Sequence, residues 1–239
     1  MTPDPAGAGS PGESSAGIGR GELSAGARRG ETRWPAAAAV LAAVVVQVLL
    51  TDRLVPGPTL LLPGLEMILL AGLLVADPSR LSRESKDLRL LAVVVIGLVA
   101  LINAVALGTL VNRLVGSGLS NGRELLGSAA GVWLTNVLVF GLAYWELDRG
   151  GPLARAGARA APASPDLWFP QDADPRSAAP GWQPVFADYL FVSLTSATAF
   201  SPTDAMPLTP RAKLLMGVQS LVSLLTIGLV AARAVNILK

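Results

Sequence analysis

The chain contains no cysteine and no histidine. These absences exclude disulfide bonds, metal sites built on thiolate or imidazole ligands, and catalysis by Ser–His or Cys–His pairs. Charged residues make up only 15% of the chain, and the formal net charge is +2. So small an excess of positive charge does not suit a nucleic-acid partner. We therefore expect no metal site, no cofactor, no nucleic-acid partner and no enzymatic activity.

Hydrophobic residues are abundant, at 51% of the chain, and they gather in long blocks. Apolar blocks of about 18 residues or more are typical of helices that cross a lipid bilayer. We predict an all-α fold, a multi-pass transmembrane helical bundle in the cell membrane, with five spans and one re-entrant helix and loop. The predicted spans lie at about 34–50, 59–76, 88–111, 125–145 and 212–237.

Composition divides the chain into four parts. Residues 1–33 are rich in Gly, Ala, Ser and Pro and are predicted to be a disordered tail. Residues 34–145 form a four-helix transmembrane region, 146–187 an irregular extramembrane linker, and 188–239 a pore-loop-like helix, a returning loop and the last span. The second span holds Glu66, for which the sequence leaves two interpretations open: handling of an ion or proton, or a position close to the interface.

The segment 189–200 is apolar but about twelve residues long. A helix of that length reaches roughly 18 Å, too short for a hydrocarbon core of about 30 Å. It is followed by Ser201-Pro202-Thr203-Asp204, so we predict a helix that dips into the membrane and returns as a loop. Positive charge places the N-terminus in the cytoplasm, so the short helix, after four spans, would enter from that side. Channel-type pore helices enter from outside, and the sequence leaves this conflict open.

The stretch 195–213 resembles the pore loop of tetrameric cation channels of the potassium type. In that family the pore helix ends in Thr-Thr-Val-Gly-Tyr-Gly-Asp. Here the matching run is Thr198, Ala199, Phe200, Ser201, Pro202, Thr203 and Asp204, and Thr195 lies one turn earlier. The family's glycines allow backbone angles that Ser, Pro and Thr resist, so the resemblance does not imply the family's ladder of inward carbonyls for Ser201, Pro202 and Thr203.

More of the chain is similar to a family of bacterial integral-membrane proteins that is described as channel-like because of this loop. The similarity rests on four spans, a long linker, the loop itself and the run Tyr-Trp-Glu-Leu-Asp-Arg-Gly-Gly-Pro at 144–152. That family has no assigned activity, so this similarity implies no function of its own. The resemblance to potassium-type channels implies a homo-oligomer, a tetramer if a pore is formed, and an inorganic cation as the partner.

Several polar residues of the last part have two interpretations. Thr195 and Thr198 either line a pore or pack against another helix, and Asp204 either attracts cations or bonds the amides of its own loop. In the last span Gln219, Ser223 and Thr226 share one helical face, which either lines the path or forms hydrogen bonds between helices. Two functions follow: an ion-channel-like protein, or a non-conducting membrane scaffold or accessory subunit.

Overall fold

The computed structural model describes residues 34–54, 86–115, 122–152, 154–155, 164–174, 176, 178–199 and 205–237. Within these residues the chain is mostly helical, as the composition predicts. The long helices are α1 (Trp34–Leu54), α3 (Lys86–Val115), α4 (Gly122–Leu147) and α7 (Pro210–Ile237). The shorter elements are the 3-10 turn η1 (Asp148–Gly150), α5 (Pro170–Ala173), α6 (Phe186–Ala199), and the antiparallel strands β1 (Leu167–Trp168) and β2 (Met206–Pro207).

Three of the described helices are long and apolar enough to cross a membrane: Arg89–Leu114, Glu124–Gly150 and Pro210–Arg233. The described apolar part of α1 is shorter, Trp34–Val46. The helix itself continues to Leu54, past the end predicted for this span at about residue 50. The predicted tail 1–33 and the predicted second span, with Glu66, lie outside the described residues.

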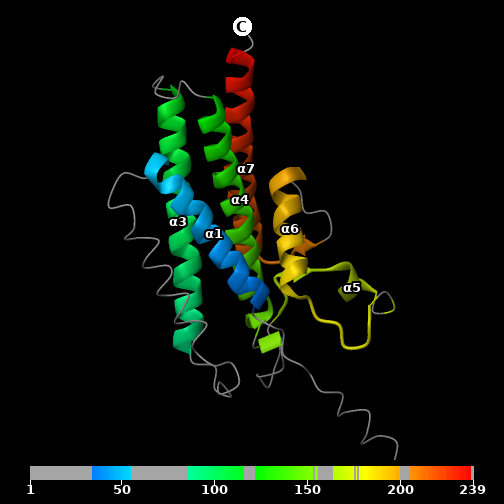
Figure 1. Ribbon diagram of the computed structural model, residues 1–239. Helices are drawn as coiled ribbons and strands as arrows, with labels where there is room; N and C mark the ends of the chain where they lie inside the picture. The colour runs from blue at the N-terminus through cyan, green and yellow to red at the C-terminus, as the bar shows by residue number, and fades with distance from the viewer. Residues whose placement is uncertain are drawn as a thin grey trace, which may run out of the picture.

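Helix α4 occupies the centre of the bundle, and α1, α3, α6 and α7 all pack against it (Figure 1). Its apolar window is 67% buried, against 22% for that of α7, so α4 is the inner helix and α7 an outer one. One hydrophobic core joins all five of these helices, with Val40, Val95, Val139, Tyr189 and Met216 among its members. A second core, nearer the start of α4, contains Leu107, Leu110, Leu125 and Val132.

The ends of the helices set the topology. Helices α3, α6 and α7 begin at the end of the bundle where α4 finishes, and the N-terminal end of α1 lies there too (Figure 1). The ion pair between Arg89 and Glu146, with 4.0 Å between Nε and Oε1, fixes the start of α3 beside the end of α4. At the same end, the ring of Phe186 packs edge-on against Trp145, with 6.0 Å between centroids.

Two boundaries differ from the sequence prediction. The short helix begins at Phe186, three residues earlier than expected, because the Asp188 carboxylate accepts a 2.7 Å hydrogen bond from the Val185 amide and caps the first turn from inside the helix. The linker, predicted to be irregular, contains η1, β1 and α5, because β1 finds its partner in β2, about forty residues later.

Candidate functional site

Helix α6 and its attachments form the candidate site. The helix has 14 residues, which corresponds to roughly 21 Å, again less than a hydrocarbon thickness of about 30 Å. The chain enters it beside Trp145 and reappears in β2, which pairs with β1 at the same end of the bundle. The segment 186–206 therefore begins and ends at one end of the bundle, although α6 itself points toward the other end.

Gln219 of α7 connects three helices, because its side chain forms hydrogen bonds with both α4 and α6. Its side chain is 0% exposed, and its Oε1 accepts a 2.6 Å hydrogen bond from the Tyr144 hydroxyl of α4. Its Nε2 donates to the carbonyl oxygen of Ser193 at 2.8 Å and to the Ser193 Oγ at 2.7 Å. The Ser193 hydroxyl in turn donates to the Val137 carbonyl of α4 at 2.6 Å. One amide of α7 thus satisfies polar groups of two other helices, α4 and α6.

Asn136 of α4 extends this network along α7. Its Nδ2 donates to the Ser223 Oγ at 2.9 Å and to the backbone oxygen of Gln219 at 3.2 Å. Thr226, 2% exposed, donates to the Val222 carbonyl of its own helix at 2.8 Å. The predicted polar face of the last span, Gln219, Ser223 and Thr226, is therefore closed off from solvent inside a single chain. These three side chains form hydrogen bonds within α7 and between α7 and its neighbours.

The two threonines predicted near the pore use their hydroxyls locally. Thr195 donates to the carbonyls of Phe191 and Val192, both at 3.0 Å, and Thr198 donates to the Leu194 carbonyl at 2.9 Å. Thr195 is half-buried, whereas Thr198 and Ala199, at the end of α6, are exposed. The other predicted loop residues, Phe200, Ser201, Pro202, Thr203 and Asp204, lie outside the described residues.

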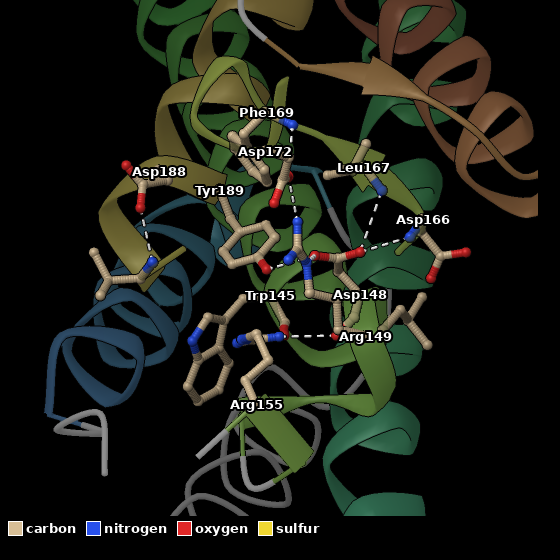
Figure 2. Close-up of polar contacts among 12 residues, drawn as sticks. Trp145, Asp148, Arg149, Arg155, Asp166, Leu167, Phe169, Asp172, Asp188 and Tyr189 are labelled. Atoms are coloured by element: carbon tan, nitrogen blue, oxygen red, sulfur yellow. Dashed lines mark hydrogen bonds and ion pairs between the residues drawn. The ribbon is translucent and has the colours of Figure 1, made fainter. Parts of the chain in front are cut away.

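The Asp148 carboxylate anchors both α6 and the linker at the end of α4 (Figure 2). It is 1% exposed, and its Oδ1 accepts the amides of Asp166 at 2.7 Å and Leu167 at 3.2 Å. Its Oδ2 accepts the Tyr189 hydroxyl of α6 at 2.6 Å and the Nε of Arg149 at 3.3 Å. Four donors compensate the burial of this charge, as a buried carboxylate requires.

The turn after α4 needs unusual backbone angles. Arg149 adopts φ 54°, and the next two residues, Gly150 and Gly151, have φ 82° and 93°. A Cβ at Gly151 would lie 2.9 Å from the Glu146 carbonyl oxygen, so only glycine fits. Arg149 tolerates the left-handed region because its guanidinium pairs with Asp172 as well as with Asp148. The Gly-Gly pair was predicted only as part of a family pattern, and its structural reason is this turn.

A further ion pair ties the start of α7 to the linker. Asp166, 4% exposed, accepts the Thr209 hydroxyl at 2.5 Å and the Nε of Arg211 at 2.7 Å, and its other oxygen pairs with the same guanidinium. Arg155 donates to the carbonyls of Trp145 at 2.8 Å and Asp148 at 2.9 Å and covers the end of α4. Asp166, Thr209 and Arg211 were missed from sequence because their contacts join segments 43 and 45 residues apart. Arg155 was missed although its carbonyl partners lie only 7 and 10 residues away.

The charges of this end balance. The carboxylates of Asp148 and Asp172 pair with Arg149, and that of Asp166 pairs with Arg211. The third guanidinium group, that of Arg155, donates to backbone carbonyl oxygens at the end of α4. Among the residues that the structure describes, no group of three acidic or other metal-ligating side chains could hold a metal ion. Away from the site, the Arg176 guanidinium lowers the pKa of Asp174 through hydrogen bonds, but both side chains are exposed and solvent screens the pair.

No protein-family model matches this chain, and no curated protein or solved structure is significantly similar to it. The similarity to the bacterial channel-like family thus stays a prediction.

Proposed function

We propose that the chain is an ion-channel-like membrane protein in which α6 and the returning segment 200–204 form a re-entrant loop that passes inorganic cations. The observation that carries the proposal is the placement of α6. It is too short to cross a bilayer, it lies beside two helices that are long enough, and its chain enters and leaves at one end of the bundle. Such a segment is tolerated in a membrane only where protein or water surrounds it.

The same topology supports five spans in the plasma membrane. Helices α1 and α3 begin at the same end of the bundle, so the chain between them has to pass from one end to the other (Figure 1). A second span at 59–76 would supply that crossing. In this arrangement α6 enters from the side of the N-terminal tail, which is the cytoplasmic side if the positive charges decide the orientation.

A cation path of this kind requires several copies, because one loop cannot enclose a filter. Helix α6 lies at the edge of the bundle, and its outward face is exposed at Phe191, Leu194 and Thr198. This face leaves room for a neighbouring copy near the end of α6. The resemblance to potassium-type channels implies a homotetramer. The C-terminal end of α6, with its partial negative charge, would then point toward the shared path.

The alternative is a non-conducting scaffold or accessory subunit. It is favoured by the polar network, because Gln219 and Ser223 are fully buried and take their hydrogen-bond partners from α4 and α6 of the same chain. In that case the network serves only to hold α6 in the bundle.

Flux measurements on purified protein in liposomes separate the two functions. The channel proposal predicts cation flux above that of empty vesicles, and it predicts that Asp204→Ala lowers the flux. Asp174→Ala is the matched control, since it removes an exposed carboxylate of the linker that lies outside the re-entrant segment. Absence of flux under several ion gradients would refute conduction and leave the scaffold. Flux that is equal in Asp204→Ala and the unaltered protein would refute the assignment of the cation path to the re-entrant segment.

A further inference from the structure

Strands β1 and β2 form a two-stranded ribbon that turns one side inward and the other outward. Leu167 is 1% exposed, whereas Trp168 is 39% exposed and lies opposite Met206, which is 68% exposed. Leu208, just after β2, is 46% exposed. These three outward side chains, Trp168, Met206 and Leu208, are called the ribbon patch below. Large apolar side chains clustered in this way on a surface mark a site of contact with something other than water.

The ribbon patch lies at the level where two candidate spans end. The Leu167 amide donates to Asp148, which is within two residues of the end of the span Glu124–Gly150. Leu208 precedes Pro210, the first residue of the span Pro210–Arg233, by two positions, and its amide donates to the Asp166 carbonyl at 2.8 Å. Spans end in the headgroup region, where the mixed apolar and polar character of tryptophan is favoured.

The exposed apolar surface continues from the ribbon into α7. Leu214, Val218 and Leu221 are 68%, 44% and 56% exposed, and their spacing of four and three residues places them on one helical face. On a membrane span this face meets hydrocarbon. The ribbon patch therefore continues a lipid-facing surface along the chain, which argues for lipid as its occupant.

We propose that the ribbon patch is an interfacial membrane anchor, inserted at the boundary between the headgroups and acyl chains of one leaflet of a phospholipid bilayer. In this position the bilayer holds the return end of the segment 186–206 and, through β1, the described linker. The anchor acts together with Asp148 and Arg211, which fix the inner side of the same region. The anchor does not depend on conduction and would serve a scaffold equally well.

Spin labels at single cysteines test the anchor directly, because the chain has no native cysteine. Met206→Cys and Leu208→Cys would be labelled and reconstituted in vesicles of phosphatidylcholine and phosphatidylglycerol. The collision rates with oxygen, which concentrates in lipid, and with a water-soluble nickel chelate would then be compared. Two controls bracket the result: Leu221→Cys on the exposed face of α7, and Ala179→Cys on the exposed part of the linker.

The anchor predicts an oxygen-to-nickel ratio at positions 206 and 208 that is severalfold higher than at 179 and lower than at 221. A ratio at both positions equal to that at 179 would place the ribbon patch in water and overturn the proposal. Protection of both labels from oxygen and nickel together would also overturn it, since protein, such as a second copy, would then cover the patch.

Discussion

Replacing Gln219 by leucine tests whether the buried amide holds α6 in place. The change keeps the size of the side chain and removes three hydrogen bonds, one from Tyr144 and two to Ser193. Hydrogen bonds between membrane helices contribute on average about 0.6 kcal/mol each and at most about 1.7 kcal/mol. Because the Tyr144 hydroxyl also stays buried without its acceptor, we expect α6 docking to weaken by about 2–4 kcal/mol.

The detachment of α6 can be followed through a cysteine at Ser196, which is 1% exposed and faces the bundle. If the thiol reacts with a maleimide only when α6 opens, a loss of about 2–4 kcal/mol raises the labelling rate about 30- to 1,000-fold. Thr226→Val is the matched control, because Thr226 is equally buried on α7 but bonds its own helix, and its labelling rate should stay that of the parent. A rate for Gln219→Leu within twofold of the parent would show that the network does not hold α6.

Three further substitutions probe the anchors at the end of α4, each measured as the unfolding midpoint in mild detergent by tryptophan fluorescence. Asp148→Ala leaves a buried hydroxyl and two buried amides without an acceptor, and should destabilise the protein by about 3–5 kcal/mol; a cost below that of one hydrogen bond would contradict the anchor. Gly151→Ala should lower the free energy of unfolding by about 1–3 kcal/mol or more, because Gly151 has a φ of 93° and lies close to the Glu146 carbonyl. Gly181→Ala should lower it by less, because Gly181 has a φ of 73° but open space around it. Equal losses would show that the close approach to Glu146 is unimportant. Arg211→Met leaves Asp166 without its cation, and since the arginine side chain is 53% exposed we expect a loss of about 1–2 kcal/mol; no change would show that the pair is screened.

The sequence predicted the long helices of the described chain, and three of them are long enough and apolar enough to cross a membrane. The spans Arg89–Leu114, Glu124–Gly150 and Pro210–Arg233 match the apolar blocks predicted at 88–111, 125–145 and 212–237 to within about five residues, because block length alone decides whether a helix can cross a bilayer. The short length of α6 was likewise predicted, from the twelve-residue segment 189–200. The loop predicted after it, from Ser201, lies outside the described residues.

The partners of the polar residues were not predictable. The shared face of Gln219 and Ser223 follows from helical spacing, but nothing in the sequence says that Ser193 and Asn136 lie opposite. Asp148 shows the same limit, since three of its four donors come from 18 to 41 residues away and meet only after the linker has folded back. A single aspartate at the end of a span was the one local signal available.

The most direct test of the central claim is the sidedness of the two ends of the re-entrant segment. Single cysteines at Ala187, at the start of α6, and at Lys213, in the first turn of α7, are both exposed and can be labelled with a membrane-impermeant maleimide in vesicles of each orientation. Asn112→Cys, exposed near the far end of α3, marks the opposite side. The account predicts that positions 187 and 213 react from the same side and position 112 from the other. Reaction of positions 187 and 213 from opposite sides would contradict it, because the segment would then cross the membrane.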